Sequence, residues 1–219
     1  MPTTVAILGG TGGLGRALAL RACASGHPVV IGSRTAEKAE ATAAELRSLL
    51  PDAQVVGLPN VRAVEGSDLT VLSVPFDGVG TLTSSLGAAL EGRVLIDTVV
   101  PLRIRRGFAE LEPIAGAASA GEWLQAALPA VRVVSAFKTV PAATLADVAG
   151  PARADVLVCG DDDRARRDVI GWIGRMVGLR AVDAGTIRNA RYVEGITALL
   201  VNLNVQHHAR TSVTITGLS

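Results

Sequence analysis

The chain has 219 residues, and its 49% hydrophobic and 19% charged content is that of a packed globular protein. A formal net charge of +1 and 3% aromatic residues argue against nucleic acid or an anionic membrane surface as a partner. Because residues 1–4 carry no basic residue ahead of the first apolar run, we expect no secretory signal and a cytoplasmic location.

The first 136 residues alternate between short apolar runs rich in β-branched residues and longer segments with helical spacing. The runs that predict strands lie at residues 5–8, 29–31, 54–56, 69–72, 94–96 and 131–134. One helical segment between them carries an apolar face formed by Ala39, Ala43, Leu46 and Leu50. Wholly apolar strands alternating with helices predict a parallel sheet covered on both faces, as in the Rossmann-type doubly wound α/β fold.

The pattern changes after residue 136. Residues 156–158 predict another strand, and the apolar face of the helix after it comprises Val169, Ile170, Ile173 and Val177. A second apolar helix is expected from about Asn189 to Gln206, and alternation at residues 211–216 predicts a closing strand. We therefore expect a Rossmann domain over residues 1–137 and a smaller C-terminal α/β unit over residues 138–219.

A glycine-rich sequence follows the first predicted strand directly and opens the first predicted helix. It reads Gly10-Thr11-Gly12-Gly13-Leu14-Gly15, which is the spacing of the dinucleotide-binding fingerprint. Gly10 permits a tight turn, Gly12 lets a pyrophosphate approach the backbone, and Gly15 lets helix and strand pack closely. The helix N-terminus offers free N–H groups and positive potential to the phosphates. A glycine-rich turn without a ligand is the alternative interpretation.

The end of the second predicted strand indicates which dinucleotide is bound. NAD sites usually place Asp or Glu there to bind the ribose hydroxyls. This chain has Gly32-Ser33-Arg34 instead, with Lys38 one helical turn later. A hydroxyl, a planar guanidinium and an ammonium suit a 2′-phosphate, so the sequence predicts NADP. Two solvated cations on a loop are the alternative.

Two further loops follow strands that are expected to end at the same edge of the sheet. Ser73-Val74-Pro75 follows the fourth predicted strand, and Thr98-Val99-Val100-Pro101 follows the fifth. Ligands of an open parallel sheet lie beyond the carboxyl ends of its strands. We therefore expect both loops to flank the nicotinamide.

The sequence shows no recognisable catalytic acid or base and no metal-ligand spacing. The single tyrosine, Tyr192, is not part of a Tyr-x-x-x-Lys pair. His27 precedes the second strand on the side away from the site, and His207 and His208 lie near the C-terminus. We therefore predict no metal site, no catalytic side chain, and a reaction that needs little proton transfer by the protein. Hydride transfer between two bound cofactors is of that kind.

Taken in order, these motifs resemble the NADPH-dependent reductases of coenzyme F420, an 8-hydroxy-5-deazaflavin. The matching segments are Gly9–Gly15, Gly32–Arg34, Lys38, Ser73–Pro75, Val134–Phe137, Val158–Asp162, Asp183–Gly185 and Glu194. They cover nearly the whole chain. The resemblance implies reversible hydride transfer between NADP(H) and coenzyme F420, with the two rings stacked in a cleft between the large and small parts, and it implies a homodimer.

The resemblance also implies which residues contact the cofactors. On the NADP side these are Thr11, Gly12, Gly13, Leu14, Ser33, Arg34, Lys38, Val74, Val100 and Ala142. On the deazaflavin side the matching positions are Lys138, Val140, Gly195 and Thr197, and the family more often has histidine at the position of Lys138. Residues Arg103, Arg105 and Arg106 would steer the anionic deazaflavin tail, or else form a solvated basic loop.

Two other functional interpretations stay open at this point. The Rossmann domain could belong to an NADPH-dependent reductase of another acceptor, such as a flavin, a metal chelate or an imine. It could instead belong to a regulator that binds NADP without turnover. The absence of a visible acid or base is compatible with both.

Overall fold

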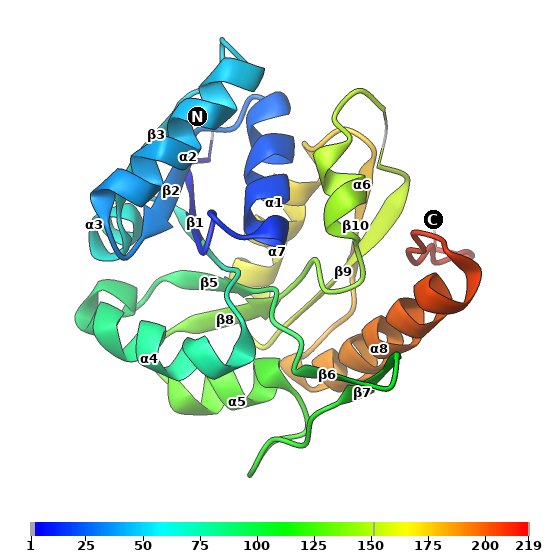
Figure 1. Cartoon of the computed structure of the whole chain (residues 1–219). Helices are drawn as coiled ribbons and strands as arrows, with labels where there is room; N and C mark the ends of the chain where they lie inside the picture. The colour runs from blue at the N-terminus through cyan, green and yellow to red at the C-terminus, as the bar shows by residue number, and fades with distance from the viewer. Residues whose placement is uncertain (1–2, 151, 219) are drawn as a thin grey trace.

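The computed structural model describes residues 3–150 and 152–218, so residues 1–2, 151 and 219 lie outside the described part. The strands of its central sheet are β1 (Val5–Leu8), β2 (Val29–Ser33), β3 (Val55–Pro59), β4 (Leu69–Leu72), β5 (Val94–Asp97), β8 (Arg132–Ser135), β9 (Ala154–Gly160) and β10 (Leu179–Asp183). The helices are α1 (Gly13–Ala24), α2 (Ala36–Leu49), α3 (Asn60–Glu65), α4 (Phe76–Leu86), α5 (Ala120–Ala127), α6 (Ala142–Ala146), α7 (Asp163–Ile173) and α8 (Ala190–His207), with 3-10 turns η1 (Gly87–Leu90) and η2 (Ile187–Asn189). Figure 1 shows the helices on both sides of the sheet.

The sheet has the strand order β10-β9-β8-β5-β4-β1-β2-β3. Neighbouring strands pair in parallel, except β8 and β9, which run antiparallel. Val5 of β1 pairs with Val29 of β2 on one side and with Leu69 of β4 on the other. The strand order therefore reverses beside β1, and ligands of doubly wound sheets bind in the crevice at such a point. The predicted Rossmann-type fold is confirmed.

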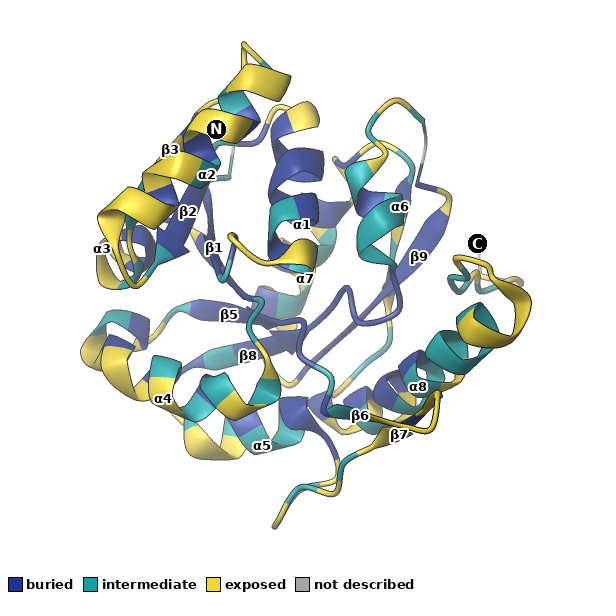
Figure 2. Ribbon diagram, viewed as in Figure 1, coloured by how far each residue is buried: buried dark blue, intermediate teal, exposed yellow. Residues whose placement is uncertain are grey.

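Apolar side chains fill both faces of the sheet, as the uniformly apolar strands predicted. On one face, Leu18 of α1, Leu46 of α2 and Trp172 of α7 belong to one buried cluster. On the other face, Val79 of α4 and Leu124 of α5 belong to a second cluster. Figure 2 shows the strands as the most buried part of the molecule.

The later part of the chain extends the same sheet. Strands β9 and β10 lie beyond β8, and Val193 of α8 packs with Leu157 of β9 and Val182 of β10. The helix expected over residues 189–206 is confirmed as α8. The division of the chain at residue 137 stays a prediction. Among the described residues, no helix combines the length and the apolar character needed to cross a bilayer.

Two expectations for the later part are wrong in detail. Helix α7 ends at Ile173, so Val177 lies beyond it with 60% of its surface exposed, and the fully buried Trp172 joins the apolar face instead. Residues 211–216 form no strand within the described chain. A single backbone bond joins this segment to β9, from the nitrogen of Asp155 to the oxygen of Val213 at 3.0 Å. A single backbone hydrogen bond is too few to pair this segment with β9 as a strand.

A small hairpin that the sequence analysis did not predict follows β5. Its strands are β6 (Leu102–Arg105) and β7 (Phe108–Leu111), which pair antiparallel around a turn at residues 106–107. The hairpin is fastened to α8, because the backbone N–H and carbonyl of Ala109 bond to the amide of Asn202 at 2.7 and 2.9 Å. The loop after β5 is thereby tied to the last helix.

Candidate functional site

The glycine-rich loop between β1 and α1 is shaped by two close backbone contacts. Gly9 has φ +82°, and a Cβ atom there would lie 2.2 Å from the carbonyl oxygen of Ser73. A Cβ atom on Gly15 would lie 2.5 Å from the carbonyl oxygen of Gly9. The predicted close packing at Gly15 is therefore confirmed. The positive φ of the turn belongs to Gly9, whereas Gly10 packs against Ile31.

The start of α1 is open to an anion. Its N-cap is Gly12, no side chain of the described residues caps it, and its first turn contains no acidic residue. Thr11, Gly12 and Gly13 are exposed. Free N–H groups at a helix N-terminus attract phosphate, and this terminus lies at the carboxyl edge of the sheet.

A cavity of about 820 Å³ lies next to this loop. Six residues predicted to bind the dinucleotide line it: Thr11, Ser33, Arg34, Lys38, Val74 and Pro75. They come from four segments, the glycine-rich loop, the end of β2, the start of α2 and the end of β4. The structure thus brings together residues that are far apart in the sequence, around the reversal of strand order.

The end of β2 presents positive charge to the cavity. Arg34 and Lys38 are exposed, and neither forms an ion pair with a carboxylate of the described residues. Helix α2 begins here, and the hydroxyl of Thr35 accepts a hydrogen bond from the backbone nitrogen of Lys38 at 3.4 Å. Two unpaired cations and the hydroxyl of Ser33 can hold a dianion at this place.

Three other residues predicted on the NADP side, Ser73, Val100 and Ala142, do not line this cavity. Ser73 is half-buried, and its backbone nitrogen donates to the carbonyl oxygen of Leu8 at 2.9 Å, which continues the β1–β4 pairing into the loop. Val100, after β5, and Ala142, which begins α6, are half-buried and do not line the cavity described above.

The residues predicted on the deazaflavin side form a second group around α8. Thr197 donates its hydroxyl to the carbonyl oxygen of Lys138 at 3.0 Å, so the loop after β8 contacts α8 directly. Val140 is buried and Gly195 is half-buried. Their contacts with a ligand stay a prediction.

Lys138 takes part in a buried cluster of charges. Its Nζ atom lies 2.6 Å from Oδ2 of Asp97 and 2.9 Å from Oε1 of Glu194, and the three side chains are 0–2% exposed. Burial opposes the charge of the ammonium, but the two carboxylates outweigh it and raise the pKa of Lys138. Burial also raises the pKa of Glu194, against the attraction of Lys138. One ammonium therefore lies between two carboxyl groups and offsets the charge of only one of them.

The remaining reactive residue types lie away from the cavity. Cys23 and Cys159 are free thiols, and burial raises the pKa of each to about 11. His27 is buried edge-on against Trp172, with the ring centres 6.0 Å apart. His207 and His208 are exposed at the end of α8. In residues 3–150 and 152–218, no three His, Cys, Asp or Glu side chains gather as metal ligands.

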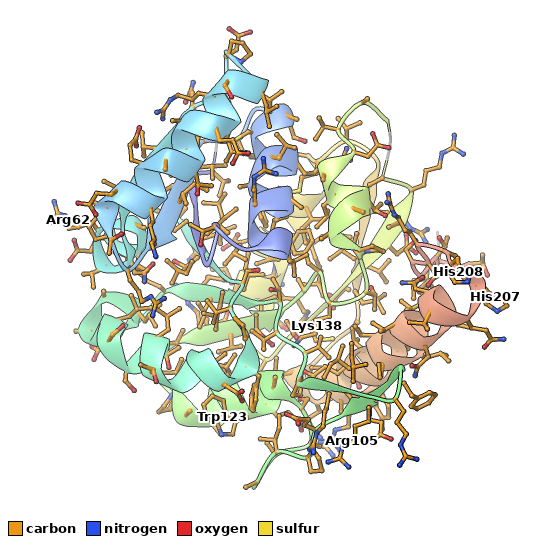
Figure 3. The ribbon with its side chains drawn as sticks, in the orientation of Figure 1. Arg62, Arg105, Trp123, Lys138, His207 and His208 are labelled. Carbon is orange, nitrogen blue, oxygen red and sulfur yellow. The ribbon has the colours of Figure 1, made fainter. Side chains whose placement is uncertain are left out.

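The arginines of the hairpin differ in their partners. Arg103 pairs with Glu112 at 2.5 Å. Arg105 and Arg106 are exposed near the turn of the hairpin, and Figure 3 shows Arg105 at the edge of the molecule. Their proposed contact with an anionic tail stays a hypothesis.

Several cavity residues were missed by the sequence analysis. Pro59, Asn60 and Val61 lie where β3 meets α3, and Thr81, Leu82 and Ser85 lie on α4. The three α4 residues have the i, i+1 and i+4 spacing of one helix face, which the sequence displays. Which helix faces the crevice depends on strand order, and no local pattern gives that.

A second hollow, of about 550 Å³, lies between the starts of β9 and β10 and the C-terminal segment. Its Arg180 already pairs with the buried carboxylate of Asp155 at 2.5 Å, so this side chain's charge is neutralised. The cavity beside the glycine-rich loop is the better candidate for a ligand, because its Arg34 and Lys38 pair with no carboxylate in the described part of the chain.

Comparison with known proteins gives matches over the whole chain. The family described as "NADP oxidoreductase coenzyme F420-dependent" matches residues 4–101. The F420-dependent NADP reductase of Methanocaldococcus jannaschii is 37% identical, with 98% of each chain covered. The enzyme of the same name from Methanothermobacter marburgensis is 35% identical, again with 98% of each chain covered.

A solved structure agrees with these sequence matches. A protein from Arthrobacter sp. FB24, described as a candidate F420-dependent NADP reductase, superposes with a TM-score of 0.79 and 26% sequence identity. The superposition covers 95% of this chain and 96% of that one. The match therefore extends beyond residues 4–101 into the later part of the chain.

Proposed function

Because the chain belongs to the family of coenzyme F420-dependent NADP oxidoreductases, we propose that it catalyses reversible hydride transfer between NADP(H) and coenzyme F420. The single observation on the structure that carries this proposal is the cavity beside the glycine-rich loop, where Arg34 and Lys38 have no ion-pair partner among residues 3–150 and 152–218. The relatives supply the identity of the second cofactor.

The site offers one set of groups for the pyrophosphate of NADP and another for its 2′-phosphate. The uncapped start of α1 would hold the pyrophosphate through Thr11, Gly12, Gly13 and Leu14, with Gly10 and Gly15 shaping the turn. Ser33, Arg34 and Lys38 would bind the 2′-phosphate. Ser73, Val74, Pro75, Val100 and Ala142 would flank the nicotinamide.

On the opposite side, we place the deazaflavin against the group formed by Lys138, Val140, Gly195 and Thr197. Gly195 has no side chain, and a Cβ atom there would meet nothing within 4 Å, so the helix surface offers room for a flat ring. Lys138 contributes through its backbone and its buried ion pairs, because its ammonium is enclosed. Within this group, the hydrogen bond from Thr197 to the carbonyl oxygen of Lys138 joins α8 to the loop after β8.

Catalysis in this arrangement depends on positioning. The two cofactors supply the chemistry, which is transfer of a hydride from carbon to carbon. The protein has to hold the reacting carbons at roughly 3–3.5 Å and keep water away. The apolar side chains of Val74, Val100 and Val140 suit the second task, and no side chain has to act as nucleophile, acid or base.

We also propose a cytoplasmic homodimer. Ile104 and Phe108 of the hairpin and Leu199 and Val205 of α8 are 53–67% exposed, and apolar groups on neighbouring elements favour burial against a second subunit. Sedimentation equilibrium tests the dimer. A monomer at micromolar concentration would contradict it.

The activity is tested by mixing the purified protein with NADPH and oxidised coenzyme F420 and following the visible absorption band of the deazaflavin. Bleaching of the band is expected with NADPH, and much slower bleaching with NADH. A flavin, an iron chelate and a cyclic imine serve as competing acceptors. Oxidation of NADPH by one of these but not by coenzyme F420, or tight NADP binding without turnover, would contradict the proposal.

A further inference from the structure

The buried cluster of Lys138, Asp97 and Glu194 has no polar hydrogen left to offer a ligand. The three N–H bonds of Lys138 point to Asp97, to Glu194 and to the carbonyl oxygen of Val99 among the described residues. Both oxygens of Glu194 accept from the backbone nitrogen of Ala120, at 3.0 and 3.1 Å. Any effect of the cluster on a reaction must therefore pass through the elements that it joins.

The cluster joins the two sides of the proposed cleft. Each of its charged residues lies one to three positions before a residue proposed to contact a cofactor. The pairs are Asp97 and Val100, Lys138 and Val140, and Glu194 and Gly195. Figure 3 shows Lys138 in the middle of the molecule, between the sheet and α8. The bond from Thr197 to the carbonyl oxygen of Lys138 adds a second tie between the same elements.

We propose that Lys138 is a positioning residue for hydride transfer, which fixes the separation between the end of β5 and α8. This inference rests on the proposed function, because β5 then leads to the nicotinamide side of the cleft and α8 forms the deazaflavin side. A shift of α8 away from β5 would lengthen the path of the hydride. The ammonium prevents that shift by binding a carboxylate on each element.

Charged groups suit this task better than apolar ones. An apolar contact tolerates sliding, whereas an ammonium between two carboxylates is satisfied only at short distances and in fixed directions. Buried ion clusters add little net stability compared with apolar packing, but they favour one arrangement over others. Glu194 also binds the start of α5 through Ala120 and Gly121, which fixes the rotation of α8 about its axis.

The main test replaces Lys138 by methionine, which keeps an unbranched side chain one atom shorter and removes the charge. We expect the dissociation constant of NADPH to stay within about twofold, because none of the residues proposed to hold its phosphates bonds to Lys138, Asp97 or Glu194. We expect the single-turnover rate of hydride transfer to fall by about tenfold or more, since small misplacements of reacting groups have effects of this size. The control is Leu46→Ala, which creates a cavity under the last turn of α2, at the opposite edge of the sheet. It destabilises the protein without touching the cluster.

A pH profile separates positioning from general destabilisation. In Lys138→Met, Asp97 and Glu194 face each other without a cation, so one carboxyl should take up a proton and its pKa should rise. The transfer rate should then fall as the pH increases through that value. The other groups nearby are the hydroxyl of Ser135 and the thiol of Cys159, whose pKa is about 11, and both stay neutral. The double variant Lys138→Met/Glu194→Gln should lack this step.

The outcomes distinguish the positioning role of Lys138 from the proposed function of the protein. A wild-type transfer rate in Lys138→Met, or equal losses in Lys138→Met and Leu46→Ala at matched thermal stability, would overturn the positioning role. If Lys138→Met does not fold, Glu194→Gln keeps the shape of the side chain, and an unchanged transfer rate there would overturn it as well. A wild-type protein that never reduces coenzyme F420 would instead contradict the proposed function.

Discussion

Arg21 in α1 donates a hydrogen bond from Nε to the carbonyl oxygen of Leu145 in α6, at 3.1 Å and across 124 positions of sequence. Its other nitrogens bond to the carbonyl oxygens of Thr144, Gly150 and Val177 at 3.0–3.3 Å, and to that of Asp147. The residue is 1% exposed, and burial lowers the pKa of its guanidinium. One side chain thus joins the helix after the glycine-rich loop to three later segments.

We expect Arg21→Met to lower the free energy of unfolding by about 2–4 kcal/mol, because it removes a buried guanidinium whose hydrogen bonds end on five carbonyl oxygens, that of the buried Leu145 among them. Arg16→Met on the same helix is the control. Its partner Glu45 is exposed, so the loss there should stay below about 1 kcal/mol. Urea denaturation measures both. If both variants lose the same free energy of unfolding, the hydrogen bonds of Arg21 stabilise the protein no more than an exposed ion pair does.

Arg34→Ala tests the selectivity for the phosphorylated dinucleotide. Loss of a charge-assisted bond worth about 1.5–3 kcal/mol should weaken NADP binding at least tenfold and leave NAD binding unchanged. Calorimetry with both dinucleotides gives the ratio. Arg62→Ala is the matched control, because Arg62 lies on the neighbouring α3, pairs with Glu65 and does not line the cavity (Figure 3). A parallel loss of NAD affinity in Arg34→Ala would contradict the assignment.

Two glycines of the same loop should respond in opposite ways to alanine. At Gly15 the new methyl group would meet backbone atoms of Gly9 and Gly10 at 2.5–3.0 Å, so we expect a loss of stability of about 1–3 kcal/mol. At Gly13 it would meet nothing within 4 Å, and alanine favours the helix by up to about 1 kcal/mol. Gly13→Ala should therefore keep its stability but bind NADP more weakly, since the methyl group faces the proposed phosphates. Thermal unfolding with and without NADP separates the two effects, and unchanged NADP affinity in Gly13→Ala would argue against phosphates at this place.

The stability of the protein should decrease in acid partly through Asp155. The hydrogen bond from Arg180, together with that from the backbone of Ile215, holds the pKa of this carboxyl below its ordinary 3.8. A depressed pKa contributes stability above the unfolded value, which is lost as the pH falls through the folded value. Asp155→Asn should therefore flatten the decline of unfolding free energy below about pH 4, and lower stability at pH 7 by about 1 kcal/mol. Arg180→Met should flatten the decline of unfolding free energy in the same way. If both variants lose stability in acid as the wild type does, the Asp155–Arg180 pair is not the source of that loss.

The residues of the glycine-rich loop and of the end of β2 that line the cavity could be predicted because their pattern is local. A strand, a glycine-rich turn and a helix occur in immediate succession around Gly10–Gly15, and the residues at the end of β2 indicate the phosphate without any knowledge of the rest. The cluster around Lys138 could not be predicted in this way. Its partner Glu194 is 56 residues away, and no periodicity of the sequence encodes that contact.

The two wrong predictions of secondary structure also arise from contacts that the local sequence does not encode. Val177 fits the helical spacing, but α7 ends at Ile173, so the apolar pattern continues beyond the helix. Residues 211–216 alternate between polar and apolar side chains, as a strand does. To form a strand, however, they would need a neighbouring strand whose edge is free along the whole segment. Next to Asp155 the edge of β9 is free, because β8 reaches only Cys159 and Gly160, and there the segment forms its one backbone–backbone bond to β9.

The bare N-terminus of α1 couples ligand binding to folding. Helices α2, α5 and α7 begin with capping side chains, namely those of Thr35, Ser119 and Asp162. A cap of this kind is worth about 1 kcal/mol to its helix, and α1 lacks one within the described chain. A bound pyrophosphate would take the place of the cap. Amide hydrogen exchange in the first turn of α1 should therefore slow markedly when NADP is added, which makes this turn a built-in reporter of occupancy.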